Sequence, residues 1–223
     1  MEAKRQRAYM VTFILSPPSA KKCLSLAKEQ GVENIFVLRG KGTVNNRTLQ
    51  LLGIKRQDKV VLNMMLDANK ARTFLNRTSE ELALHKPNHG IAFLTPIERM
   101  VYGEEEMSAN SMMDILPEEE DMQYKKLTVV VNLGMAEEIM TVAREAGARG
   151  GTILHGRGTG EQVPEKLFGI EIEPEKELLL ILATEDVVNS VIAALEDAFD
   201  FARPGTGILF VESISDVRGL VSK

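Results

Sequence analysis

The chain has 223 residues, of which 44% are hydrophobic and 26% charged, and this length allows one large domain or two domains of about 100 residues each. The net charge of -5, the absence of Trp and an aromatic content of 5% disfavour a nucleic-acid-binding protein, which needs clustered cations or stacking platforms. The single cysteine, Cys23, excludes an intramolecular disulfide and indicates a reducing, cytoplasmic location.

The first strand is expected at residues 10–15, an apolar run that is too short for a signal-peptide core or a membrane span. A helix follows near residues 19–30, and its periodicity places Cys23 among buried apolar side chains rather than at a reactive site. A first β-α-β-β-α-β series is completed by strands at 34–38, 60–66 and 91–95 and a helix near 68–78.

The segment 104–124 is rich in acidic residues and methionine and contains few strand-forming residues, so we expect a linker there. Two interpretations of it stay open. The apolar side chains could form a short helix face that docks on a domain, or the segment could be a mobile tether. The apolar residues concerned are Met112, Met113, Ile115 and Leu116.

The same order of elements returns after the linker. Gly147 ends the first helix of this second series in the manner of a C-terminal glycine. The order β-α-β-β-α-β is that of the split-βαβ, ferredoxin-like fold. The expected strands lie at 127–132, 150–155, 178–183 and 207–212, and the expected helices at 135–146 and 187–198.

The two series also resemble each other in sequence. An offset of 116 positions aligns residues 10–66 with 126–182 without a gap, giving 14 identities in 57 positions where about 3–4 are expected by chance. Beyond Leu66 we expect this offset to change by one. The pattern predicts an internal duplication, with a first copy at 9–103 and a second copy at 125–223. The protein is therefore expected to be an α+β protein of two tandem ferredoxin-like domains.

A long connection separates the second and third strands of each copy. In the second copy it runs from Gly156 to Lys176, whereas a plain hairpin needs only about two to five residues, and such length is typical of a functional loop. The loop begins with Gly156-Arg157-Gly158-Thr159-Gly160, and the first copy has Gly40-Lys41-Gly42-Thr43 at the same place. Glycines let a backbone approach a phosphate, but they equally make the tight turn that leaves a strand.

This loop resembles the T-loop region of the PII nitrogen-regulatory family, through its glycine-rich root and through Phe168-Gly169-Ile170 and Pro174-Glu175-Lys176 on its return. The run Arg203-Pro204-Gly205-Thr206-Gly207 resembles the B-loop of the same family. The resemblance covers residues 126–220 and extends to 9–103 through the duplication. It implies a trimeric regulator, not an enzyme, that binds adenine nucleotides between subunits and contacts transporters or enzymes through its T-loops.

The sequence departs from the family pattern where phosphate would be bound. Ile208, and Ile91 in the first copy, stand at the B-loop position of a phosphate-binding lysine. The lysine of the T-loop return falls at Glu175, and the terminal Arg-x-Arg pair is reduced to Arg218. We therefore expect an anion to be bound by backbone N–H groups with the help of two arginines. The predicted ligand-binding residues are Gly40, Lys41, Gly42, Thr43, Gly156, Arg157, Gly158, Thr159, Gly160, Arg203, Gly205, Thr206 and Gly207.

The predicted function is that of a PII-like regulator that senses a small anionic ligand and controls a transporter, enzyme or transcription protein of nitrogen metabolism. Two alternatives stay open, a small enzyme or metal-handling protein on the same scaffold and an adaptor that has lost ligand binding. No residue pattern supports a catalytic triad, and His85 and His89 with Cys23 fit no closed zinc site, so neither catalytic nor metal-binding residues are predicted.

The predicted assembly is a homo-oligomer, with a trimer of chains favoured. In the runs 127–131 and 178–182, most side chains are apolar on both faces of the strand, so both faces of the sheet are expected to be covered. Closed symmetry makes a trimer or a dimer the simplest arrangement that covers them. We also expect the loops 157–175 and 41–59 to be more mobile than the strands that they join.

Overall fold

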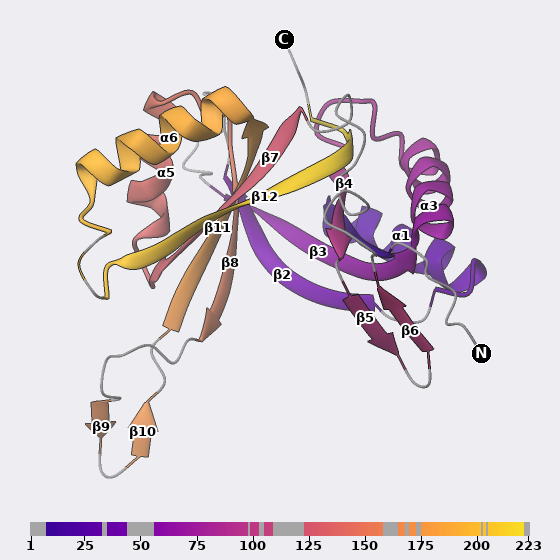
Figure 1. The fold of residues 1–223 in the computed structure, drawn as a ribbon, viewed down its shortest axis with the longest axis horizontal. Coiled ribbons are helices and arrows are strands. Elements are labelled where there is room, and N and C mark those ends of the chain that lie inside the picture. The colour runs from indigo at the N-terminus through magenta and orange to yellow at the C-terminus, as the bar shows by residue number, and fades with distance from the viewer. Residues whose placement is uncertain are drawn as a thin grey trace. The chain divides into compact units, whose positions relative to one another are not determined.

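A computed structural model describes residues 8–32, 35–43, 56–97, 99–102, 105–108, 123–157, 165–167, 170–172, 175–201, 203 and 205–220. These residues form a mixed α/β fold in which strands dominate (Figure 1). The chain divides into two compact units. Unit 1 comprises Met1–Leu38, Lys59–Tyr124 and Ser213–Lys223, and unit 2 comprises Arg39–Asp58 and Lys125–Glu212. Among the helices described, none is long and apolar enough to cross a membrane.

Unit 1 contains a sheet with the strand order β2-β3-β1-β4. β1 lies inside this sheet, antiparallel to both neighbours, with Val11 opposite Met64 of β3 and Leu94 of β4. The order is the one that the split-βαβ pattern predicts. The elements are β1 (Ala8–Leu15), α1 (Pro17–Glu29), β2 (Ile35–Thr43), β3 (Arg56–Asp67), α3 (Ala68–Glu81) and β4 (Ile91–Ile97).

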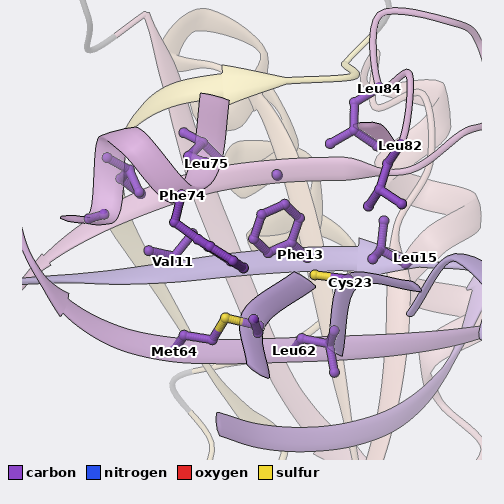
Figure 2. Packing of buried hydrophobic residues seen from close by; sticks show 14 of the residues in the cluster. Val11, Phe13, Leu15, Cys23, Leu62, Met64, Phe74, Leu75, Leu82 and Leu84 are labelled. Carbon is purple, nitrogen blue, oxygen red and sulfur yellow. The ribbon is translucent and has the colours of Figure 1, made fainter. Parts of the chain in front are cut away.

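The core of unit 1 lies between this sheet and its two helices (Figure 2). Phe13 of β1 and Phe74 of α3 meet edge to face, with their ring centroids 5.8 Å apart. Cys23 of α1 is fully buried here, and burial raises the pKa of its thiol to about 12. The prediction that Cys23 is buried among apolar side chains is confirmed. The core also contains Tyr9, Val11, Leu15, Ala20, Ala27, Leu62, Met64, Ala71, Leu75, Leu82, Leu84, Ala92 and Leu94.

Unit 2 contains a sheet with the order β8-β11-β7-β12, which is the same order in the second half of the chain. Helices α5 and α6 lie side by side (Figure 1). Their apolar residues and those of one sheet face, such as Val129, Ile153 and Leu179, form a second core. The elements are β7 (Tyr124–Asn132), α5 (Ala136–Glu145), β8 (Thr152–Arg157), β11 (Glu175–Thr184), α6 (Glu185–Ala198) and β12 (Gly207–Arg218).

The two largest extensions beyond a predicted C-terminal end are in β2 and β12. The predicted strand 34–38 continues to Thr43, where β2 pairs with β8 in unit 2 and Gly40 lies opposite Leu154. The predicted strand 207–212 continues to Arg218, where β12 pairs with β4 in unit 1 and Ser215 lies opposite Leu94. Both extensions depend on the backbone of a strand far away in the sequence, so local propensity did not predict them.

Two small hairpins were also not predicted. β5 (Arg99–Tyr102) pairs with β6 (Glu105–Ser108), which falls inside the predicted linker. In the long connection of the second copy, β9 (Glu165–Leu167) pairs with β10 (Ile170–Ile172) (Figure 1). Residues 109–122, with the four apolar linker residues, lie outside the described residues.

The core-facing residues correct the predicted alignment of the two copies. Val11 and Leu127 both face a core, as the offset of 116 predicts. In the third strands, however, Leu62 and Leu179 face the cores, and these are 117 positions apart. The offset therefore changes before β3 and not beyond Leu66, because a strand shifted by one residue would turn its apolar set away from the core. The duplication and the boundaries 9–103, 104–124 and 125–223 stay predictions.

Candidate functional site

The root of the long loop in unit 2 is formed by the end of β8 and the start of β11. These antiparallel strands place three pairs opposite each other, His155 with Glu177, Gly156 with Lys176 and Arg157 with Glu175. Arg157 is exposed. The glycine-rich sequence therefore starts on a paired strand, whereas Gly158, Thr159 and Gly160 lie outside the described residues.

A buried carboxylate fixes this root to the first turn of α5. Glu177 is 1% exposed, and its Oε2 accepts hydrogen bonds from the backbone N–H of Gly134 at 3.0 Å and of Ala136 at 2.9 Å. Met135, the N-cap residue of α5, has no side-chain acceptor for these groups. Glu177 thus supplies from a neighbouring strand the negative charge and the acceptor that a helix N-terminus needs. The other carboxylate oxygen lies 3.4 Å from Nε2 of His155.

Two further contacts hold the same root. The backbone N–H of Leu133 donates to the carbonyl of Glu175 at 3.2 Å. Nζ of Lys176 donates to Oδ1 of Asn132 at 2.5 Å. A lysine is therefore present on the loop return, one position after Glu175, but its amine is hydrogen-bonded to the end of β7.

The glycines at the two loop roots have different roles. A Cβ atom at Gly40 would lie 2.6 Å from Cδ2 of Leu154 and 2.7 Å from the carbonyl oxygen of Ile153, which is too close for any other residue. At Gly156 the nearest atom to an added Cβ would be Cδ1 of Leu178 at 3.8 Å, an ordinary contact. Packing therefore requires glycine at Gly40, whereas it leaves Gly156 free for a role in ligand approach.

The other first-copy candidates are engaged in the structure of unit 2. The hydroxyl of Thr43 accepts from the N–H of Gly151 at 2.8 Å and donates to its carbonyl at 3.2 Å. Lys41 forms an ion pair with Asp58, and the hydrogen bond and charge of this lysine lower the pKa of the Asp58 carboxyl. Gly42 is buried opposite Thr152 of β8.

The predicted B-loop forms a turn before β12. The N–H of Thr206 donates to the carbonyl of Arg203 at 3.2 Å, and Gly205 has a φ of 87°, which favours glycine. A Cβ atom at Gly207 would lie 2.6 Å from the carbonyl oxygen of Val130, so packing requires this glycine. The side chain of Arg203 is exposed. Ile208, at the position of the missing lysine, is 65% exposed.

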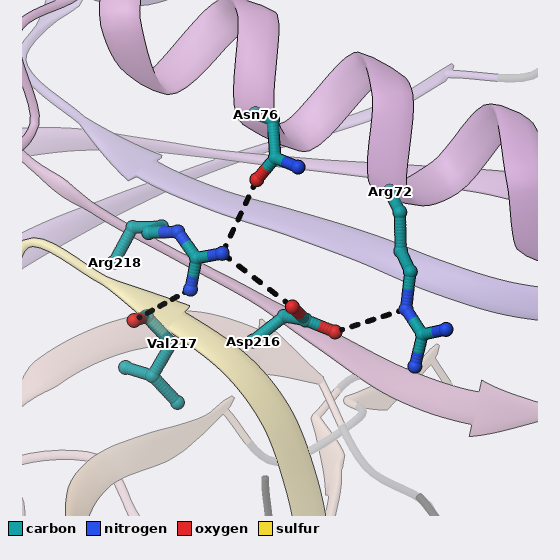
Figure 3. Close-up of polar contacts among 5 residues, drawn as sticks. All are labelled: Arg72, Asn76, Asp216, Val217 and Arg218. Atoms are coloured by element: carbon teal, nitrogen blue, oxygen red, sulfur yellow. Dashed lines mark hydrogen bonds and ion pairs between the residues drawn. The ribbon is translucent and has the colours of Figure 1, made fainter.

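A polar cluster that the sequence did not reveal fixes the end of β12 in unit 1 (Figure 3). Nε of Arg72 donates to Oδ2 of Asp216 at 3.3 Å, and Nη2 of Arg218 donates to Oδ1 of Asn76 at 3.2 Å. Arg72 and Asp216 are 144 positions apart, so no local signal could pair them. Arg218 is therefore bound to Asn76 of α3.

Among the residues that the structure describes, no group of three or more His, Cys, Asp or Glu side chains is placed so that it could hold a metal ion. Cys23 lies in the core of unit 1. The ring of His89 is hydrogen-bonded through Nδ1 to the backbone oxygen of Leu82 at 3.0 Å.

The sequence model of the family "Nitrogen regulatory protein P-II" matches residues 124–221, which is less than half of the chain. The match confirms the resemblance for these residues. No curated protein sequence matches the chain.

Solved structures similar to part of the chain include PII of Arabidopsis thaliana bound to citrate, with 15% identity, a TM-score of 0.35 and coverage of 44% of this chain and 83% of that one. CPII of Thiomonas intermedia bound to ADP, AMP and acetate has 19% identity, a TM-score of 0.32 and coverage of 45% and 89%. The GlnK–ATP complex of B. subtilis has 18% identity, a TM-score of 0.32 and coverage of 44% and 95%.

Proposed function

Since residues 124–221 are related to the PII nitrogen-regulatory family, we propose that this protein is a regulator that senses a small anionic ligand, an adenine nucleotide in the first instance. In this proposal, ligand binding changes the conformation of the long loop between β8 and β11. The loop in turn regulates a transporter, an enzyme or a transcription protein of nitrogen metabolism. The protein is proposed to act in the cytoplasm, as a homo-oligomer and without catalysis of its own.

The observation that carries the proposal is the loop root of the second copy. An unobstructed glycine, Gly156, and an exposed cation, Arg157, stand on strands that are fixed by hydrogen bonds at their base. A fixed root that carries an exposed cation is suited to binding an anion, because the strand that holds the cation needs little reorganisation when the ligand arrives. The proposed site comprises Gly156, Arg157, Gly158, Thr159 and Gly160, with Arg203, Gly205, Thr206 and Gly207 as its second part.

Titration calorimetry with ATP, ADP, AMP, cyclic nucleotides and 2-oxoglutarate tests this proposal. We expect one of these ligands to bind and to raise the melting temperature, because a ligand selective for the native state must stabilise it. Turnover of a nucleotide, or tight stoichiometric metal binding, would favour the alternative of a small enzyme or metal-handling protein. Failure of every ligand to bind would favour the adaptor.

A matched pair of glycine variants tests the site itself. Gly156→Ala should keep the melting temperature of the wild type, because its Cβ would meet only Leu178 at 3.8 Å, but should weaken ligand binding. Gly150→Ala is the control, since its Cβ would also make only an ordinary contact, 3.5 Å from the hydroxyl of Thr43. Equal affinities of the two variants would exclude a close approach of the ligand at Gly156.

A further inference from the structure

The contact between Glu177 and α5 joins three features that the sequence shows separately, a strand, a helix start and the loop root. Glu177 reaches the helix from β11, and 41 positions separate it from Ala136. Its neighbour on β8 is His155, the residue before Gly156. A displacement of Glu177 would therefore displace the strand pair from which the glycine-rich sequence emerges.

The first copy lacks this contact. With the offset of 117 that the core residues establish, Val60 stands where the second copy has Glu177, and a valine cannot accept a hydrogen bond. The start of α1 has fewer donors to satisfy, because its first two residues, Pro17 and Pro18, have no N–H group. The anchor thus belongs to the second copy alone.

The candidate residues of the first copy are also engaged elsewhere. Gly40 is required by close packing against β8, the hydroxyl of Thr43 is hydrogen-bonded to Gly151, and Lys41 is paired with Asp58. In the second copy, a Cβ atom at Gly156 would make only an ordinary contact with Leu178, and Arg157 is exposed. The two copies have therefore diverged at the same place in the fold.

We propose that the second copy carries the ligand site and that Glu177 is its positioning residue, which holds the loop root against the first turn of α5 so that Gly156 and Arg157 are presented in one arrangement. This inference rests on the proposed function. It goes further in two respects. It assigns the ligand site to the second copy, and it proposes that Glu177, which does not contact the ligand, determines the geometry of that site.

Two substitutions of Glu177 separate its charge from its hydrogen bonds. Glu177→Val introduces the residue of the first copy and removes both acceptor contacts. Glu177→Gln keeps one amide oxygen that can accept from Gly134 and Ala136. We expect Glu177→Val to weaken ATP binding about tenfold in calorimetry and Glu177→Gln to restore it to within about threefold of the wild type.

The matched control is Asp67→Ala. Asp67 caps α3 in unit 1, where its carboxylate accepts from the N–H of Lys70 at 3.0 Å, so its loss removes a helix cap of the same kind away from the proposed site. We expect this variant to lose stability but to bind ATP within about twofold of the wild type. An affinity of Glu177→Val equal to that of Asp67→Ala would overturn the inference.

Amide hydrogen exchange supplies a readout that does not depend on the substitutions folding equally well. In the wild type, ATP should slow exchange in residues 133–137 as well as in 155–157, and unchanged exchange at 133–137 would contradict the coupling. If no ligand of the panel binds the wild type, the proposed function is wrong. Hydrogen exchange in the ligand-free proteins then still tests whether Glu177 holds the loop root. If residues 153–157 exchange as slowly in Glu177→Val as in the wild type, Glu177 does not hold it.

Discussion

The attachment of the C-terminal strand to unit 1 can be tested at Gly219. This residue has a φ of 79°, and an added Cβ would lie 2.0 Å from the carbonyl oxygen of Gly90 and 3.1 Å from that of Leu84. Gly31 provides the matched control, because its φ of 67° is similar and nothing lies within 4 Å of its added Cβ. Gly31→Ala should thus introduce backbone strain alone, whereas Gly219→Ala should introduce the same strain and a clash with the backbone of Gly90.

The magnitudes follow from these two terms. A left-handed conformation costs a residue other than glycine about 1–2 kcal/mol, and this applies to Gly31→Ala and Gly219→Ala alike. Placing a side chain in a site that is already filled costs about 1–3 kcal/mol more, because backbone atoms must move. Detachment of the strand end would limit this cost, since it would give up the hydrogen bonds of Arg72 with Asp216 and of Arg218 with Asn76 (Figure 3).

Urea unfolding of both variants and the wild type measures the difference. With an m-value of about 2 kcal/mol per molar urea, the midpoint of Gly219→Ala should lie roughly 0.5–1.5 M below that of Gly31→Ala. Hydrogen exchange in residues 213–220 should be faster in Gly219→Ala alone. Equal midpoints of the two variants would refute the reasoning that the close approach of Gly219 to Gly90 contributes to stability.

Three further predictions concern the core, the sheet of unit 2 and the assembly. Burial raises the pKa of the Cys23 thiol from the ordinary 9.0 to about 12, so the neutral buried thiol contributes fully to the free energy of unfolding below pH 9.0, and this contribution falls by about 1.4 kcal/mol per pH unit above it. Between pH 9.0 and about 12 the free energy of unfolding of the wild type should therefore fall more steeply than that of Cys23→Ala. Parallel pH profiles of the two proteins would exclude the effect. Gly40→Ala should lower the melting temperature by several degrees because of its contact with Leu154, and an unchanged value in calorimetry would contradict that packing. Light scattering should give about three times the chain mass of 24.7 kDa, and a mass equal to one chain would reject the predicted trimer.

Local sequence was sufficient to predict the strands and helices whose buried face is shown by the spacing of apolar residues over a short segment. The run at 10–15 and the run at 127–132 are strands, and the periodic segments after them are helices, because apolar residues on one face identify which side of an element is buried. The burial of Cys23 followed from the same periodicity. The glycine-rich sequences did not mark the ends of the strands, because Gly40 and Gly42 lie within β2 and Gly156 lies within β8.

The roles of individual residues were decided by neighbours that are distant in the sequence. Gly40 and Gly156 have similar sequence contexts, and only the contacts across the strand pair, with the side chain of Leu154 and the carbonyl oxygen of Ile153, make glycine necessary at the first of them. Glu177 stands in an apolar strand, and its function as the cap of α5 depends on how β11 packs beside that helix. The continuation of β12 onto β4 could not be predicted, because the hydrogen-bonding groups of a strand edge are the same for every sequence and only the tertiary structure selects which edges meet.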